Sequence, residues 1–346
     1  MNKVYVGLSG GVDSSLSAAL LLEAGYDVVG VYMKNWSQDL PGMKCPWAED
    51  LADAKRIAVQ LGIPFKVFDF EKEYKHLVVD YMVREYEAGR TPNPDVMCNK
   101  EVKFGLFLQA ALSDGADKIA TGHYAQIGKA GAKAQLLRAV DENKDQTYFL
   151  YRITEKALEK TLFPIGHLTK PEVRQYASKR GLITASRRES QGICFVGNVG
   201  IKEFLTQYIQ TETGNIVEKD SGKIVGQHDG AIFYTFGQRH RLGVGGGMPY
   251  YVVGKDMAKN EVYVSTNLND NKFWKKEIRL TDRHWINETP KNDKTYQARL
   301  RHRGSLIECT IKNDVLKLNQ AERAIASGQS AVLYDNEVCL GGGIVD

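Results

Sequence analysis

Short apolar runs and helically spaced apolar positions alternate through the first half of the chain. The runs are rich in β-branched residues and predict strands at residues 3–8, 28–33, 65–68 and 118–121. Apolar residues three and four positions apart predict helices at residues 14–24, 47–61, 71–88 and 104–112. This alternation is typical of an α/β domain with a doubly wound parallel sheet, which binds ligands at the carboxyl ends of its strands.

The pattern changes after about residue 197. A helix at 201–209 and strands at 215–218, 250–255 and 261–265 predict a small mixed connector. From about residue 272 the chain follows the strand period, with strands predicted at 295–303, 306–312, 315–318, 330–334 and 337–340. We therefore expect three domains: a catalytic domain at 1–197, a connector at 198–270 and a C-terminal antiparallel β-barrel at 271–346.

The composition is that of a folded protein, because 43% of the 346 residues are hydrophobic and 25% are charged. These fractions exclude intrinsically disordered and collagen-like chains. The longest apolar run, Leu16 to Leu22, is far shorter than the roughly 20 residues that a bilayer requires, and the N-terminus lacks a signal sequence. We expect a cytoplasmic protein with no membrane partner.

Positive charge is concentrated in two parts of the chain. Residues 151–200 hold nine Lys and Arg against four Asp and Glu, and residues 271–346 hold thirteen against ten, whereas the whole chain has a net charge of +4. Such a bias suits a polyanion such as nucleic acid, although a solvated protein face is an equally simple explanation of this charge alone.

The chain has five cysteines, which are Cys45, Cys98, Cys194, Cys309 and Cys339. Their odd number and wide spacing do not indicate a disulfide framework, so we expect a reducing compartment. No pair forms the CxxC spacing of a zinc site, and we expect no metal site other than a place for Mg²⁺ that accompanies ATP. Cys309 and Cys339 lie in strand patterns and are expected in the core.

The strongest local signal is the loop Ser9-Gly10-Gly11-Val12-Asp13-Ser14-Ser15, which follows the first predicted strand. Adjacent glycines let several backbone N–H groups point into one concavity, and the next helix adds its positive end. The loop therefore predicts a phosphate site, although a turn simply rich in Gly and Ser is the alternative. Asp13 would repel a bare phosphate, so we expect it to cap the helix or to hold Mg²⁺.

Two further segments place cysteines beside other reactive groups. Thr91 to Asn99 reads TPNPDVMCN, and its prolines predict a stiff loop that presents Asp95 and Cys98, a carboxylate and a thiol. Ser190 to Gly197 reads SQGICFVG and follows Arg187-Arg188, whose charge would favour a thiolate at Cys194. Incidental burial of either cysteine is the alternative, but two such thiols suit sulfur exchange.

The string SGGVDSS resembles the pyrophosphatase loop of N-type ATP pyrophosphatases. Seven further motifs follow in order: TPNPDVMCNKEVKF, TGHYA, KDQTYFL, FPIGHLTKPEVR, SQGICFVG, YTFGQRHRLGVGG and CLGGGIV. Together they span nearly the whole chain and resemble the tRNA-specific 2-thiouridylase family, whose members replace the C2 oxygen of a wobble uridine with sulfur.

The resemblance implies ATP with its Mg²⁺ as cofactors and a tRNA as substrate. It assigns the nucleotide to ten residues: Gly7, Leu8, Ser9, Gly10, Gly11, Val12, Asp13, Ser14, Met33 and Gly122. In the family a persulfide on the residue matching Cys194 carries the sulfur, Cys98 corresponds to the thiol that resolves it, and Asp95 resembles the acid/base candidate. A Cys98–Cys194 disulfide would remain after turnover.

For the tRNA, the resemblance implies contacts from the catalytic domain and from the barrel. Asn93, Pro94 and Asp95 correspond to the segment that receives the flipped uridine. The other matching positions are His123, Lys144, Asp145, Gln146, Arg301, His302 and Gln329. Strand spacing would also place Arg299, Arg301 and Arg303 on one face as a phosphate track, unless that face is merely solvated, and residues 170–188 would form a second basic patch.

Three questions stay open in the sequence. Cys45 has no assigned role. One alternative is that Cys45, Cys98 and Cys194 together hold an iron–sulfur cluster. The sulfur donor would be a cysteine desulfurase or a sulfur-relay protein. A ligase that amidates a small adenylated carbonyl compound would explain the loop but not the cysteines, and a non-catalytic tRNA-binding paralogue would be expected to have lost one of these motifs.

Overall fold

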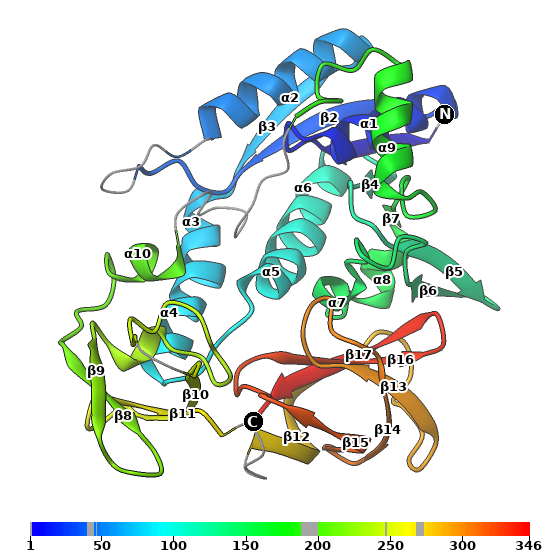
Figure 1. The fold of residues 1–346 in the computed structure, drawn as a ribbon. Helices are drawn as coiled ribbons and strands as arrows, with labels where there is room; N and C mark the ends of the chain where they lie inside the picture. The colour runs from blue at the N-terminus through cyan, green and yellow to red at the C-terminus, as the bar shows by residue number, and fades with distance from the viewer. Residues whose placement is uncertain (1, 40–44, 46, 188–199, 246–247, 268–272) are drawn as a thin grey trace.

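A computed structural model describes residues 2–39, 45, 47–187, 200–245, 248–267 and 273–346 (Figure 1). Its first part is a parallel sheet with strand order β3-β2-β1-β4-β7. The strands are β1 (Lys3–Gly7), β2 (Asp27–Lys34), β3 (Phe65–Asp69), β4 (Lys118–Ala120) and β7 (Thr161–Leu162). The predicted doubly wound α/β fold is confirmed.

Helices cover both faces of this sheet. They are α1 (Val12–Glu23), α2 (Trp47–Leu61), α3 (Glu71–Tyr74), η1 (Lys75–Val79), α4 (Asp80–Glu87), α5 (Pro94–Met97), η2 (Cys98–Phe107), α6 (Leu108–Ser113), α7 (Thr147–Leu150), α8 (Glu155–Glu159) and α9 (Lys170–Lys179). Because side chains alternate along a strand, Val4 and Val6 pack toward α1, α2 and α9, while Tyr5 packs toward the helices from α3 to α6. Burial on both faces explains the continuous apolar run of β1.

The predicted loop from Thr91 to Asn99 is wrong in its second half, because a helix begins at Pro94 and continues as α5, η2 and α6 to Ser113. Proline suits the first turn of a helix, where its missing N–H has no intrahelical partner and its φ is already helical. Asn93 keeps the predicted extended backbone, with φ −113° and ψ 94°.

The connector holds α10 (Ile201–Leu205), η3 (Ala231–Phe233) and a four-stranded sheet of order β10-β11-β8-β9. Its strands are β8 (Gly214–Glu218), β9 (Ile224–His228), β10 (Tyr251–Asp256) and β11 (Glu261–Ser265). In Figure 1 this connector and the barrel lie side by side below the parallel sheet. The predicted domain boundaries stay predictions.

The barrel is a closed antiparallel sheet of six strands. They are β12 (Trp274–Trp285), β13 (Thr295–Arg299), β14 (Ile307–Lys312), β15 (Val315–Arg323), β16 (Ser330–Asp335) and β17 (Val338–Val345). Closure occurs where β12 pairs with both β15 and β17. The CLGGGIV motif fits this closure, since a Cβ on Gly341 would lie 2.1 Å from the His284 oxygen of β12.

A hairpin from the first part of the chain extends the barrel sheet. Its strands β5 (Gln126–Ala130) and β6 (Lys133–Leu137) pair with each other, and β6 also pairs with β17 through Leu136 and Cys339. This hairpin was not predicted from the sequence. It connects the catalytic part and the barrel through a shared sheet, which fixes one relative to the other.

Candidate active site

The predicted phosphate loop connects β1 to α1 as expected. The Ser14 hydroxyl donates to the Gly11 oxygen at 3.1 Å and accepts from the Ser9 N–H at 3.2 Å, and Ser15 also donates to Gly11 at 2.8 Å. Gly10 has a φ of +75°, a conformation that favours glycine. These bonds fix a tight turn in front of the N-terminus of α1, where backbone N–H groups and the helix dipole attract an anion.

The other predicted nucleotide residues surround this turn. Leu8 and Val12 are buried at its two ends. A Cβ on Gly7 would lie 3.0 Å from the Met33 Cε, and a Cβ on Gly122 would lie 2.7 Å from the Ser14 nitrogen. The carboxyl ends of β1, β2 and β4 therefore bring together residues that are far apart in the sequence.

Asp13 does not cap α1, because the N-cap residue is Gly11, which has no side chain to accept from the first N–H groups of the helix. Its carboxylate instead accepts bonds from Lys170 Nζ, at 2.7 and 2.8 Å, and from the Tyr124 hydroxyl at 2.8 Å. Lys170 is the first residue of α9 and is only 8% exposed. The loop lacks a lysine in the sequence, but the fold supplies one, which the sequence analysis did not identify although it lies in the FPIGHLTKPEVR motif.

Arg187 binds the loop at Gly10, whereas Lys170 binds it at Asp13. Its guanidinium donates to the Gly10 oxygen at 2.8 Å and to Asp50 at 2.6 Å, and it also forms an ion pair with Asp53. Burial raises the pKa of Asp50, whereas the charge of Arg187 opposes that rise. The charge of Arg187 is therefore matched by two carboxylates of α2. Cys194 lies outside the described residues, so the predicted effect of Arg187 on its thiolate stays a prediction.

The predicted basic patch at residues 170–188 is likewise largely neutralised. Lys170 pairs with Asp13, Arg180 pairs with Glu23 at 2.6 Å, and Arg187 pairs with α2. This stretch uses its cations to attach α9 and the chain after it to α1 and α2.

Asp95 and Cys98 lie three residues apart where α5 passes into η2, so they are neighbours on one helix surface. Cys98 is 1% exposed and Asp95 is half-buried. Asn99 follows Cys98 and donates to the Phe149 oxygen at 3.1 Å. Cys194 lies outside the described residues, so its predicted pairing with Cys98 stays a prediction.

Two of the three remaining cysteines lie in the core, as predicted. Cys309 and Cys339 are buried in strands β14 and β17, and burial raises the pKa of the Cys309 thiol to about 12, which confirms both as core residues. Cys45 is half-buried and its thiol lies 3.8 Å from the Trp36 oxygen. Within the described ranges no three His, Cys, Asp or Glu side chains gather as metal ligands.

His123, a predicted tRNA contact, is 7% exposed behind the phosphate loop. Its Nδ1 lies 2.8 Å from the Thr121 hydroxyl and its Nε2 lies 3.3 Å from Lys103 Nζ. Burial holds the pKa of His123 well below 6.5, and the charge of Lys103 lowers it further. The imidazole is therefore neutral at physiological pH.

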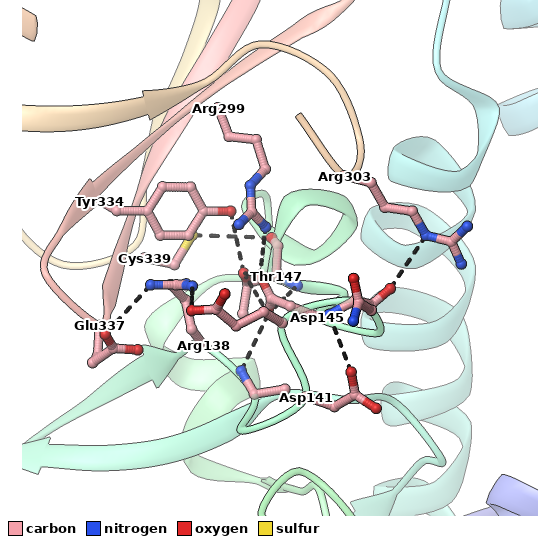
Figure 2. A network of polar contacts seen from close by, with 12 residues as sticks. Arg138, Asp141, Asp145, Thr147, Arg299, Arg303, Tyr334, Glu337 and Cys339 are labelled. Carbon is pink, nitrogen blue, oxygen red and sulfur yellow. Dashed lines mark hydrogen bonds and ion pairs between the residues drawn. The ribbon is translucent and has the colours of Figure 1, made fainter. Parts of the chain in front are cut away.

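Asp145 lies at the junction between the catalytic part and the barrel, as Figure 2 shows. It is 1% exposed, pairs with Arg299 at 2.7 Å, and accepts bonds from the Thr147 hydroxyl at 2.9 Å and the Ala139 N–H at 3.2 Å. The neighbouring Gln146 accepts from the Tyr124 N–H at 2.9 Å, and Lys144 is half-buried. The Asp145 carboxylate therefore has a structural role at the junction in addition to its predicted tRNA contact.

The prediction that Arg299, Arg301 and Arg303 share one strand face is wrong. Strand β13 ends at Arg299, whose guanidinium turns inward to Asp145, and the chain then turns through Arg303, which has a φ of +59°. Arg301 and Arg303 are exposed in this turn, and Arg301 pairs with Glu322 at 2.8 Å. Because the buried Asp145 carboxylate needs a cation, the Arg299 side chain lies inside the junction and not on the surface that strand spacing predicted.

The other two barrel residues predicted to contact tRNA lie against the catalytic part. The ring of His302 packs 4.4 Å from that of Phe149, whose oxygen accepts from Asn99 beside Cys98. Gln329 donates to the Thr91 oxygen at 2.8 Å. The barrel therefore contacts Thr91 directly, and it reaches the Asn99 end of the same segment through Phe149.

Burial lowers the pKa of His302 to about 4 from an ordinary 6.5, and Arg303 and Arg299 act in the same direction. The unfolded chain then binds a proton between pH 6.5 and 4 that the folded chain excludes, so stability falls as the pH drops through this window. We expect His302→Phe, which keeps the ring contact, to lose less stability than the parent between pH 7 and 5 in urea unfolding. Equal losses in both would contradict this.

Comparison with known proteins places all three parts of the chain in one family. The model described as "tRNA methyl transferase HUP domain" matches residues 2–198, "tRNA methyl transferase PRC-barrel domain" matches 202–266 and "Aminomethyltransferase beta-barrel domain" matches 275–345. The protein named tRNA-specific 2-thiouridylase MnmA from Bacillus subtilis is 45% identical, over 99% of this chain and 95% of its own length. Its namesake from Alkaliphilus oremlandii is 46% identical, over 99% and 97%. The chain belongs to the tRNA-specific 2-thiouridylase family.

Solved structures resemble this 2-thiouridylase family member more distantly. A 4-thiouridine synthetase in complex with RNA and ATP has a TM-score of 0.38 and 18% identity, over 60% of this chain and 50% of its own. The NMN synthetase of Francisella tularensis has a TM-score of 0.34 and 15% identity, over 55% and 66%. No helix in the described part of the chain is long and apolar enough to cross a bilayer.

Proposed function

We propose that the protein uses ATP to exchange the C2 oxygen of a tRNA uridine for sulfur. The observation that carries this proposal is the family relationship, which spans 99% of the chain with relatives named tRNA-specific 2-thiouridylase. The retained phosphate loop and the retained Cys98 and Cys194 support an active enzyme over a non-catalytic paralogue. A ligase acting on a small carbonyl compound would use neither thiol.

In the proposed first step, ATP lies on the loop from Gly7 to Ser14, between Met33 and Gly122. The N–H groups at the start of α1 would hold its phosphates, with Lys170 and Arg187 fixing the loop beside them. The uridine O2 attacks the α-phosphorus, the bond to pyrophosphate breaks, and AMP becomes the leaving group on C2.

Mg²⁺ is proposed only as the ion that accompanies the ATP phosphates. A magnesium ligand needs free carboxylate oxygens, yet both oxygens of Asp13 are already bonded to Lys170. The described residues around the loop therefore do not fit a magnesium site of the protein's own, and no step of the proposal depends on one.

In the proposed second step, a persulfide on Cys194 supplies the sulfur. Its terminal sulfur attacks C2, the proton passes to Asp95, and AMP leaves with the C–O electron pair. The Cys98 thiolate then attacks the Cys194 sulfur and breaks the S–S bond, which leaves 2-thiouridine and a Cys98–Cys194 disulfide. If Cys98 acts first, hydrosulfide is released and attacks C2, and the same disulfide remains for a dithiol to reduce.

The proposed partners follow from this chemistry. Asn93, Pro94 and Asp95 would receive the flipped uridine, and His123, Lys144, Asp145, Gln146, Arg301, His302 and Gln329 would contact the rest of the tRNA. A persulfide must be delivered to Cys194, so a cysteine desulfurase or a sulfur-relay protein is the proposed donor. We propose a cytoplasmic location, where tRNA and these donors meet.

The cleavage of ATP tests the proposal against a ligase. Persulfide-loaded protein with ATP, Mg²⁺ and unmodified tRNA is expected to release pyrophosphate and AMP, with little release of either when tRNA is omitted. Release that depends on a small carbonyl compound and an amine, and not on tRNA, would overturn the proposal in favour of the ligase.

Replacing Gly122 with alanine is expected to weaken ATP binding. The new Cβ would lie 2.7 Å from the Ser14 nitrogen and 2.8 Å from the Asp13 carbonyl carbon, so the start of α1 must move. We expect the KM for ATP to rise about tenfold or more, because phosphate-binding N–H groups lose their alignment. The control is Gly245→Ala, whose Cβ would meet nothing within 4 Å. An unchanged KM in Gly122→Ala would contradict the assignment.

A further inference from the structure

Helix η2 touches the proposed nucleotide site at two points. The ring of Phe107 lies at the first, since a Cβ on Gly7 would be 3.7 Å from its Cε1 atom. Lys103 lies at the second, where its Nζ is 3.3 Å from the Nε2 of His123, the residue that follows Gly122. Residues four apart are neighbours on a helix surface, so both contacts belong to the side of η2 that faces the carboxyl ends of β1 and β4.

The same helix begins at the reactive thiol. Cys98 is its first residue, five before Lys103, and a π-helix hydrogen-bonds residues five apart, so the two side chains stand one turn apart. The order along η2 is therefore Cys98, then Lys103, then Phe107 at the phosphate loop. In the proposed reaction the uridine meets the α-phosphorus through O2 and the sulfur through C2, so it lies between the loop and Cys98. Lys103 is half-buried and lies along the helix between these two points.

His123 fixes the position of the Lys103 ammonium. Its imidazole is neutral and an ammonium has only donors, so Nε2 accepts from Lys103 and the Nδ1–H donates to the Thr121 hydroxyl at 2.8 Å. The His123 ring packs against Phe104 and Phe163, with centroids 5.8 and 6.2 Å away, and both phenylalanines are buried. His123 therefore holds the ammonium beside an apolar wall and brings no negative charge of its own.

A fixed cation at this point suits both chemical steps. When O2 attacks the α-phosphorus, the departing pyrophosphate takes the P–O electron pair, and the α-phosphate oxygens carry negative charge in the transition state. When sulfur attacks C2, AMP takes the C–O electron pair and gains negative charge in turn. A preorganised ammonium in a site with little water stabilises such charge more strongly than a solvated one does. Lys103 keeps its proton in both steps, because it acts through its charge.

We propose that Lys103 is a further catalytic residue, whose Nζ contacts a non-bridging oxygen of the ATP α-phosphate. It stabilises the transition state of uridine adenylation and then the departure of AMP, and His123 is its positioning residue. This inference rests on the proposed function and deepens it, because it names the side chain that acts on the reacting phosphate group.

The first test is Lys103→Gln, which keeps most of the side-chain length and removes the charge. Pyrophosphate release is followed in a single turnover of persulfide-loaded protein with tRNA and ATP·Mg²⁺. We expect the rate to fall about 10²-fold or more while the Kd for ATP changes by less than about tenfold, because the contact strengthens in the transition state. The matched control is Lys100→Gln on the same helix, which removes a lysine paired with Glu101 at 2.7 Å and should keep the parent rate. An unchanged rate in Lys103→Gln, or an equal loss in Lys100→Gln, would overturn the inference.

The second test uses ATPαS, which has sulfur in place of one non-bridging oxygen of the α-phosphate. For one of its two diastereomers, the loss of rate relative to ATP is expected to be smaller in Lys103→Gln than in the parent, because both changes remove the same contact. Equal losses in the two proteins for both diastereomers would overturn the inference and leave the proposed function intact. A parent protein that releases no tRNA-dependent pyrophosphate from ATP would overturn the proposed function, and this inference with it, so the two failures are distinguishable.

Discussion

Replacing Cys98 with serine is expected to abolish thiouridine formation while ATP still binds. Serine keeps the size of a side chain that is 1% exposed, so the helix from Pro94 to Ser113 should remain folded. The hydroxyl cannot break the persulfide bond, and we expect the rate to fall about 10³-fold or more. Nucleoside mass spectrometry of the tRNA measures the product, and calorimetric titration with ATP checks the nucleotide site.

Cys45→Ser is the matched control for this loss. Its thiol lies near the Trp36 oxygen in a half-buried position, and the proposed thiol exchange does not use it, so activity is expected to remain. An equally inactive Cys45→Ser, with an iron–sulfur absorption band lost in both variants, would replace thiol exchange with the three-cysteine cluster. Full activity of Cys98→Ser would exclude Cys98 as the resolving thiol.

Replacing Arg299 with methionine is expected to destabilise the junction of catalytic part and barrel severely. It would leave the Asp145 carboxylate, which is 1% exposed, without its cation (Figure 2). An unpaired buried charge costs about 3–5 kcal/mol of unfolding free energy, which urea unfolding followed by circular dichroism would detect. Arg279→Met removes an exposed ion pair and should change it by less than about 1 kcal/mol.

The double variant Arg299→Met with Asp145→Asn separates charge from packing. Because asparagine removes the uncompensated charge, we expect this protein to regain part of the stability that Arg299→Met loses. If Asp145→Asn lowers the stability of Arg299→Met by as much as it lowers the stability of the parent protein, the two side chains act independently. The ion pair would then not hold the junction together.

Local patterns in the sequence predicted most of the fold. The buried run of β1 and the glycine-rich turn after it lie where expected, because strand period and turn chemistry act within a few residues. The β5–β6 hairpin was missed although its two strands pair locally, whereas its attachment to β17, about 200 residues further along the chain, has no local signal. The turn after Arg299 was missed for a similar reason, since Asp145 decides it.

The candidate site was predictable only where its residues are contiguous. The motif around Gly10 identified the loop, but the side chains that brace it come from far away: Lys170 lies 157 residues after Asp13, and Arg187 lies 177 residues after Gly10. No local pattern encodes such contacts. The start of the helix at Pro94 was a local signal, and it could have been identified from the preference of proline for the first helical turn.

We expect sulfur to pass from Cys194 to the C2 position of a tRNA uridine activated by ATP. The most direct measurement is a single turnover with protein loaded with ³⁵S-labelled persulfide, unmodified tRNA and ATP·Mg²⁺, followed by separation of the nucleosides. We expect radioactive 2-thiouridine from the parent protein with ATP, and none without ATP or with Cys194→Ala. Labelled 2-thiouridine formed equally well by Cys194→Ala, or without ATP, would contradict it.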